Sequence, residues 1–387
     1  MQDVVLNGKQ NSRVGEQAND KEGIMDSSGK RRKIAVACQG GGSHTAFTAG
    51  VLRRLLAREQ GEYEFVAFSG TSGGAICALL TWYGLLSGGR DEAAKLLETF
   101  WTRDNSANTV PERFLNDWIV NSTRWQQETG FLVEQSPNVF SDLAQDELGR
   151  SIERNVKFDR IDGDLVRPES PKLFVGAVEV ITGELKVFRS HKREETNLGE
   201  PRFVFEDNPN DGITLDAVLA SSAIPPLFRA VRIGRGVYWD GLFAQNPPVR
   251  DLPDAEPDEI WIIQINPSRL VPEADEPRPG DEPTKIANIL DRRNELAGNL
   301  SLEQELRYIR KINELVRERR INDLLDENPP SGNKREYRYV EVRKPIENRR
   351  PLDYATKLDR SSSFIQEMMT YGEEQADEFL DELSRTV

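Results

Sequence analysis

The alternation of short apolar runs with glycine turns near the N-terminus constrains the fold of this chain most. Lys33–Cys38 is an apolar run of strand length that ends at Gln39 and three glycines, and a helical pattern follows it. Tyr63–Ser69 is a second strand pattern that leads through Gly70-Thr-Ser-Gly-Gly74 into Ala75–Leu86. This last segment is apolar on nearly every side, which is typical of a buried helix. The alternation predicts an α/β fold with helices on both faces of a mostly parallel sheet.

The remaining chain supplies further elements of the same type. We expect one domain over residues 33–387, preceded by a disordered tail over residues 1–32, which is polar and lacks the apolar h-region of a secretory signal. Residues 90–160 are expected to form helices and loops. The other expected elements are a hairpin turning at Thr182-Gly183, a helix capped by Thr214 and stopped by Pro225 and Pro226, strands at Val237–Asp240, Glu259–Ile265 and Tyr337–Val342, and a last helix at Ser361–Leu383.

A helical insertion is expected at about residues 285–327. Apolar residues recur there at helical spacing, and Gly298 and Asn299 are expected to break the pattern into two helices. Acidic residues are interspersed among its many arginines, which favours a helical pair packed on the domain with a charged outer face. A lid, or a peripheral contact with a lipid surface, is the alternative.

The overall charge limits the class of partner. The 387 residues carry a net charge of −14, which argues against nucleic acid, because its binding depends on Lys and Arg neutralising phosphates. No apolar run approaches the roughly 18 residues that a bilayer-spanning helix needs. Cys38 and Cys77 both lie in apolar stretches, so we expect buried reduced thiols and a cytoplasmic protein.

Gly70-Thr-Ser72-Gly-Gly74 matches G-x-S-x-G, the nucleophile elbow of serine hydrolases. A sharp turn between a strand and a helix lifts the serine clear of the sheet, and glycines at 70, 73 and 74 leave room for that turn. A strand pattern precedes the motif and a buried helix follows it, which is the context that the motif requires. Ser72 is therefore the expected nucleophile.

Gly40, Gly41 and Gly42 follow the first strand. Successive glycines let backbone N–H groups converge on an anion, so we expect these three residues to form an oxyanion hole. Phosphate binding is the competing interpretation, but the chain has neither G-x-x-x-x-G-K-[ST] nor G-x-G-x-x-G at this place.

A nucleophilic serine needs a base, and the chain has two histidines. His44 lies beside the glycines at a helix start, and His191 lies in a charged stretch, so neither is a good middle member of a Ser-His-Asp triad. Asp240 ends the strand Val237–Asp240 before Gly241 and is the best candidate base. The acidic clusters at 159–164 and 207–212 do not have EF-hand spacing and are expected to be surface loops.

Four motifs in order resemble the patatin-like phospholipase family of the bacterial or archaeal type. They are the glycine triplet, Gly70-Thr-Ser-Gly-Gly-Ala, Ser221-Ser-Ala-Ile-Pro-Pro-Leu-Phe228 and Tyr238-Trp-Asp-Gly-Leu-Phe-Ala-Gln-Asn-Pro-Pro248. The similarity runs from about Lys33 to Asn266. It implies a three-layer α/β/α fold, a Ser72-Asp240 dyad, an oxyanion hole at Gly40–Gly42, and hydrolysis of acyl esters or phospholipids without a required metal or other cofactor.

This chain departs from the family pattern at two places. Leu242 stands where the family has Gly or Ala, and His44 stands near the place of a basic residue that often follows the glycines. The sequence thus predicts a serine acyl hydrolase of (phospho)lipids that forms a covalent acyl-enzyme. The alternatives are a general carboxylesterase, a thioesterase, an acyltransferase, and a non-catalytic lipid-binding protein of the same fold.

Overall fold

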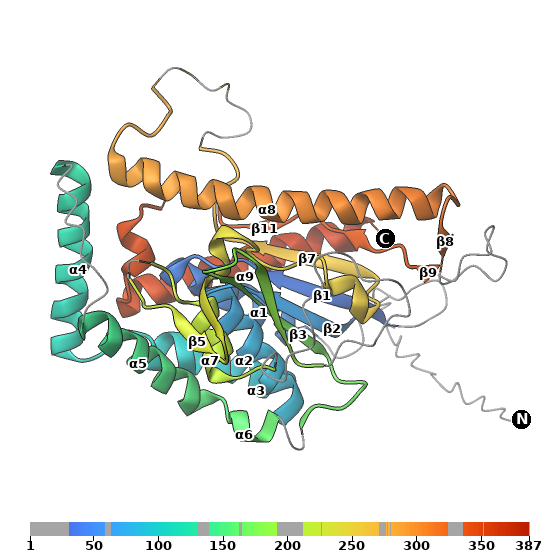
Figure 1. The fold of residues 1–387 in the computed structure, drawn as a ribbon, viewed down its shortest axis with the longest axis horizontal. Helices are drawn as coiled ribbons and strands as arrows, with labels where there is room; N and C mark the ends of the chain where they lie inside the picture. The colour runs from blue at the N-terminus through green and yellow to red at the C-terminus, as the bar shows by residue number, and fades with distance from the viewer. Residues whose placement is uncertain are drawn as a thin grey trace, which may run out of the picture.

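Helices cover both faces of a central sheet in the computed structural model, which confirms the expected three-layer α/β/α arrangement (Figure 1). Residues 1–30 of the tail expected at 1–32, residues 162–164 of the first acidic cluster and residues 207–211 of the second lie outside the described residues, whereas Arg32 already belongs to a strand. The described residues are 31–58, 63–129, 139–161, 165–191, 212–225, 227–270, 276, 278, 280–323, 336–350 and 352–386.

The sheet contains nine strands within the described residues, in the order β10-β7-β1-β2-β3-β6-β5, with β11 beside β7 and β4 beside β3. Pairing is parallel from β10 and β11 through β3, whereas β4 and β6 run antiparallel to β3 and β5 runs antiparallel to β6. The sheet strands are β1 Arg32–Cys38, β2 Tyr63–Gly70, β3 Lys172–Glu179, β4 Leu185–Arg189, β5 Val231–Ile233, β6 Gly236–Asp240, β7 Glu259–Gln264, β10 Glu341–Val342 and β11 Ile346–Glu347.

One face of the sheet carries the larger core, formed with α1, α2, α3, α7 and α9. Every residue of α2 from Gly73 to Gly84 is buried, as its apolar composition predicted. α1 and α9 approach closely at Gly50 and Gly372. A Cβ at either glycine would collide with the backbone of the other helix, so the contact requires glycine at both positions. The helices on this side and at the sheet ends are α1 Ala46–Ala57, α2 Gly73–Gly88, α3 Arg90–Thr99, α4 Val110–Thr129, α5 Val139–Asn155, α6 Phe158–Arg160, α7 Leu215–Ser221 and α9 Ser362–Thr386.

The opposite face is covered by α8, a helix from Ile286 to Arg317. Leu302, Leu306 and Ile309 pack on this face of the sheet in a second, smaller core. The prediction that Gly298 breaks the segment into two helices is wrong, because the helix continues through it. Gly298 packs against Asn246 instead, and a Cβ there would lie 3.1 Å from the Asn246 amide nitrogen.

Several local predictions are confirmed. β3 and β4 form the expected hairpin, and Gly183 in its turn has a φ of +73°. The Thr214 side chain caps α7 by accepting a hydrogen bond from the amide of Ala217. The strand expected at 337–342 is split, since β9 (Glu336–Tyr337) pairs with β8 (Asn322–Asp323) and β10 pairs with β7. In the described part of the chain, no helix is long and apolar enough to cross a bilayer.

Candidate active site

Ser72 occupies a sharp turn between β2 and α2. Its backbone φ is +57°, a left-handed conformation that costs free energy in a residue with a side chain and is often found at functional sites. The turn is tight enough that a Cβ at Gly70 would collide with the backbone of Gly74, and one at Gly74 would collide with the carbonyl of Cys38. The predicted motif therefore has the geometry of a nucleophile elbow.

Ser221, at the end of α7, holds this turn in place. The Ser72 amide donates to the carbonyl oxygen of Ser221 at 3.1 Å and to its Oγ at 3.0 Å. The Ser221 hydroxyl in turn donates to the carbonyl oxygen of Gly176 on β3 at 2.6 Å. The motif that begins at Ser221 thus connects the elbow to the neighbouring strand.

The register of β3 brings Asp240 to the same place. β4 occupies one edge of β3, so β2 and β6 lie end to end along the other edge. The last residue of β2, Gly70, pairs with Val175, and the last residue of β6, Asp240, pairs with Ala177. Two residues of a strand span about 7 Å, so the ends of β2 and β6 meet where Ser72 leaves the sheet.

Asp240 is fully buried and held from its backbone and side chain. Its amide donates to the carbonyl oxygen of Ala223 at 3.1 Å, and its Oδ1 accepts from the Leu242 amide at 2.8 Å. The Ser72 hydroxyl lies close enough to favour the ionised carboxylate. The two side chains are not aligned for a hydrogen bond, and Asp240 Oδ2 is buried without a hydrogen-bond partner among the described residues.

The environment of Asp240 changes its acidity. Burial raises the pKa of the carboxyl from its ordinary value of 3.8 to about 7, while the Ser72 hydroxyl and the Leu242 amide act in the opposite direction. Burial has this effect because it disfavours the charged form. A carboxylate with a pKa near neutrality is suited to accept a proton at physiological pH.

Leu242, the departure from the family pattern, has two contacts. Its amide binds Asp240, as described above, and its side chain reaches α8, where a Cβ at Gly298 would lie 3.5 Å from Leu242 Cδ1. Gly241 before it has no room for a side chain, since a Cβ would lie 2.7 Å from the Gly176 carbonyl oxygen. The change at 242 therefore places an apolar contact between the site loop and α8.

The glycine loop lies against the elbow. A Cβ at Gly40 would lie 2.7 Å from Ser72 Cβ, which places the first glycine directly beside the predicted nucleophile. The Gly40 amide donates to Asn246 Oδ1 at 2.7 Å, so it is already engaged. The amides of Gly41 and Gly42 have no such acceptor among the described residues. Gly42 has a φ of +59°, and a side chain there would collide with the carbonyl of Lys357.

Asn246 is a site residue that sequence reasoning missed. It is fully buried, and its Nδ2 donates back to the Gly40 carbonyl oxygen at 3.3 Å, so one side chain fixes both polar groups of Gly40. The sequence signal was the Asn-Pro-Pro that follows Asp240 by six residues, within a motif quoted only for its resemblance to the family.

Neither histidine is engaged with Ser72. His44 is buried, and its Nε2 lies 2.8 Å from the hydroxyl of Thr356, which itself donates to the carbonyl oxygen of Asp353. Burial, and then the nearby charge of Lys357, hold the pKa of His44 well below its ordinary value. His191 lies after β4, where its ring contacts the Ser190 hydroxyl and the carbonyl oxygen of Arg167.

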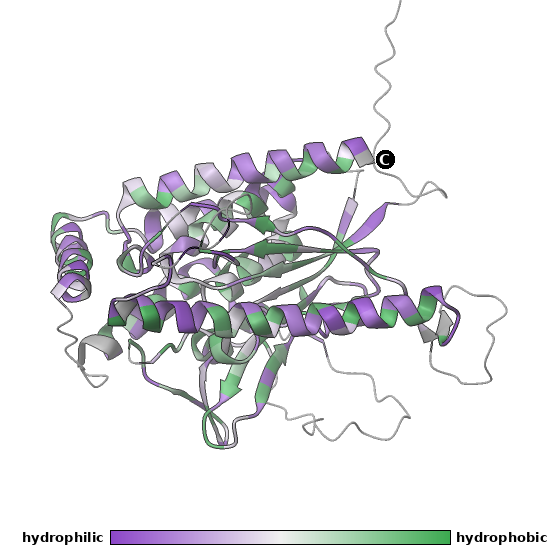
Figure 2. Cartoon of the chain, turned by 90° about the horizontal axis from the view of Figure 1, so that it is seen from above, coloured by the Kyte–Doolittle hydropathy of each residue, from purple (hydrophilic) through white to green (hydrophobic). Residues whose placement is uncertain are grey.

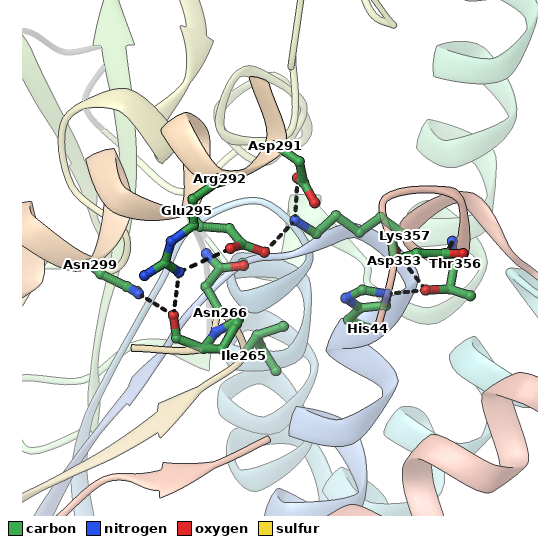
Figure 3. A network of polar contacts seen from close by, with 12 residues as sticks. His44, Ile265, Asn266, Asp291, Arg292, Glu295, Asn299, Asp353, Thr356 and Lys357 are labelled. Carbon is green, nitrogen blue, oxygen red and sulfur yellow. Dashed lines mark hydrogen bonds and ion pairs between the residues drawn. The ribbon is translucent and has the colours of Figure 1, made fainter. Parts of the chain in front are cut away.

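A network of charges centres on Lys357, whose carbonyl lies against Gly42 of the glycine loop. Figure 3 shows this network with His44 nearby. The Lys357 ammonium contacts Asp291 at 2.6 Å and Glu295 at 3.2 Å, both on α8. Burial raises the pKa of Asp291, and the charge of Lys357 partly offsets this. Among the described residues, no group of three or more acidic, His or Cys side chains is placed to hold a metal ion.

Comparison with known protein families identifies the family of this chain. Residues 36–253 match the family described as "Patatin-like phospholipase". A crystal structure of VipD from Legionella pneumophila is similar at 14% identity and a TM-score of 0.35, over 88% of this chain and 67% of that one. No curated protein gives a significant sequence match. Because the family match covers more than half of the chain, this protein belongs to the patatin-like phospholipase family.

Proposed function

We propose that this protein is a serine acyl hydrolase that cleaves fatty-acyl esters of phospholipids. One observation carries the proposal: the Ser72 hydroxyl, on a strained elbow, lies beside a fully buried carboxylate whose Oδ2 has no hydrogen-bond partner among the described residues. An unpaired buried acceptor costs free energy, and accepting the serine proton removes that cost. Membership of the family supports a lipid ester as the substrate.

The proposed reaction has two halves. Asp240 accepts the proton of the Ser72 hydroxyl as Oγ attacks the ester carbonyl carbon, and the proton then passes to the departing alcohol. In the second half, Asp240 takes a proton from water, the resulting hydroxide attacks the acyl-enzyme, and the proton returns to Ser72 as the fatty acid leaves. No metal takes part in either half.

The tetrahedral intermediates need donors for their oxyanion. We assign this role to the amides of Gly41 and Gly42, because the Gly40 amide is engaged by Asn246. Gly40 then acts as the fixed end of the loop, and it would have to leave Asn246 to become the third donor. One such donor contributes about 3–4 kcal/mol to the stability of the transition state in comparable hydrolases.

Cys38 and Cys77 are both buried and form no disulfide, which supports a cytoplasmic location.

Labelling by a fluorophosphonate probe tests the nucleophile. We expect stoichiometric labelling of the native protein and none in Ser72→Ala. In a separate assay, unlabelled protein should release fatty acid from phosphatidylcholine, within a substrate panel that includes lysophospholipids, thioesters and short p-nitrophenyl esters. The variant His44→Asn/His191→Asn should still be labelled. Loss of labelling in that variant, with the fold intact, would contradict the dyad.

A further inference from the structure

The first half of α8 has its polar and apolar sides reversed. A surface helix normally turns its apolar side to the core, as α8 does at Leu302 and Leu306. Between Ile286 and Leu300 four large apolar side chains are instead 39% to 59% exposed and Leu290 is partly buried, whereas Glu295 on the opposite side is buried. Leu300 and Leu302 show the reversal directly, because residues two apart lie roughly 200° apart around a helix. The outward apolar side chains are Ile286, Ile289, Leu296 and Leu300.

The inward side of this half is held by polar contacts. Asp291 and Glu295 bind Lys357, and Arg292 Nη1 binds Glu295 and the carbonyl oxygen of Pro267. Asn299 accepts a hydrogen bond from the Gln39 side chain at 2.9 Å. The helix is therefore firmly docked by its polar side, and its apolar side faces outward as a result of that docking.

The outward charges of this segment have one sign. From Lys285 to Leu300, the exposed charged residues are Lys285 and Arg293, while the two acidic residues point inward to Lys357. In a chain with a net charge of −14, the outward charges within this segment are therefore cationic, although Asp281 and Glu282 precede it and Glu303 follows it. An apolar stripe with such charges matches a surface of acyl chains bordered by phosphates.

α4 extends the exposed apolar surface. Val110, Phe114, Trp118 and Trp125 recur at intervals of four and seven residues and are 58% to 79% exposed, so they share one outward face of the helix. α4 contacts α8 and also contacts η7 (Ala355–Leu358), and η7 packs on η1 (Gly42–Thr45) after the glycine loop. α4 thus stands beside the N-terminal end of α8 at the active-site end of the sheet (Figure 1).

Figure 2 looks down on the outward side of α8, where apolar and polar bands alternate along the helix and α4 stands at its N-terminal end. We propose that the outward residues of α8 from Ile286 to Leu300, together with the outward face of α4, form one surface that docks on a phospholipid bilayer. We call this the docking surface. It rests on the proposed function, because a lipid acyl hydrolase has to take its substrate out of a bilayer.

Apolar burial drives this docking more than charge does. α4 carries both signs near its exposed face, as Glu112, Arg113, Asp117 and Arg124 show. Trp is favoured at the boundary between lipid and water because its ring is apolar and its N–H is polar. The docking surface therefore fits a zwitterionic phosphatidylcholine bilayer, with a modest gain from anionic lipid at Lys285 and Arg293.

The test measures binding without catalysis. Full-length Ser72→Ala protein is mixed with phosphatidylcholine vesicles, with and without phosphatidylglycerol, and the bound fraction is measured by flotation. We expect Leu296→Ser/Leu300→Ser and Trp118→Ser/Trp125→Ser each to lower partitioning by about tenfold or more. Tyr308→Ser is the matched control, because Tyr308 is exposed on the same helix but lies beyond the reversed segment. It should bind as the parent does.

A second measurement needs no surface variant. Trp82, Trp101 and Trp261 are buried and Trp239 on β6 is partly buried, whereas Trp118 and Trp125 are 62% and 58% exposed, so quenching by brominated lipid in vesicles should come mainly from these last two. Equal partitioning of all variants, or no quenching, overturns the proposal. So does a change from dimer to monomer in the apolar variants with unchanged partitioning, since a second copy would then be the partner.

Separate measurements distinguish a failure of the proposed hydrolase activity from a failure of the proposed docking surface. In the wild-type background, the docking variants should hydrolyse a soluble short-chain ester at the parent rate and lose activity only on vesicles. Fluorophosphonate labelling and soluble-ester hydrolysis report on Ser72, whereas flotation of the Ser72→Ala protein reports only on the docking surface.

Discussion

The backbone amide of Ser72 donates to both the carbonyl oxygen and the hydroxyl of Ser221, a residue 149 positions away in sequence. A left-handed φ of +57° at Ser72 persists only where surrounding groups determine it, and Ser221 supplies those groups. Ala223, two residues later, accepts the amide of Asp240. One short segment thus positions the backbones of both members of the proposed dyad.

Ser221→Ala should weaken this arrangement. We expect kcat to fall by about fivefold, because a hydrogen bond worth roughly 1 kcal/mol is lost from the elbow. Steady-state kinetics on a soluble ester would measure the change. Ser222→Ala is the control, since the Ser222 hydroxyl is buried without a partner in the described part of the chain. Equal effects of the two variants would contradict a positioning role for Ser221.

Asn246→Ala should release Gly40 and disturb the glycine loop. We expect kcat/KM to fall by about 10- to 100-fold, as for a misplaced oxyanion donor. Asn313 is a matched control, because its amide makes the same paired contact with a backbone, that of Val340, at 2.7 and 3.0 Å. Asn313→Ala should cost similar stability, about 1–3 kcal/mol, with kcat/KM nearly unchanged. A similar loss of kcat/KM in both would reduce Asn246 to a structural role.

Activity should depend on the ionisation of Asp240. Its pKa is about 7 because of burial, and only the ionised form can accept the Ser72 proton. kcat/KM should therefore fall about tenfold for each pH unit below that value and level off above it. The pH profile of soluble-ester hydrolysis measures this, and the same inflection should remain in His44→Asn/His191→Asn. A profile that becomes flat in that variant would assign the inflection to a histidine.

Asp240→Asn should stabilise the protein at alkaline pH while abolishing hydrolysis. Because folding raises the pKa of this group, its ionisation opposes folding. That cost is absent below pH 3.8, grows as the pH rises, and is complete above about pH 7. An increase in the pKa of Asp240 from 3.8 to about 7 corresponds to a loss of at most about 4 kcal/mol in the free energy of unfolding. Thermal unfolding should show a higher Tm for the variant at pH 8 and little difference at pH 4. A lower Tm at pH 8 would show that burial of the charge is not a cost.

Local signals in the sequence determined a large part of this protein. The apolar run before Gly40 and the all-round apolar α2 specified strand, turn and buried helix, because these depend on neighbouring residues and on burial. Gly70 and Gly74 marked the elbow, since a Cβ at either position has no room. The Thr214 cap and the Gly183 turn were predictable for the same reason.

Only the tertiary structure decided what depends on residues distant in sequence. β6 runs antiparallel and continues the edge that β2 leaves, so Asp240 meets Ser72 through the register of β3. Asn246 engages Gly40 across 206 positions, and α8 continues through Gly298 because that glycine packs on Asn246. The periodicity of α8 indicated a helix, but which side faces the protein was decided by Lys357, which draws Asp291 and Glu295 inward and leaves the apolar side outside.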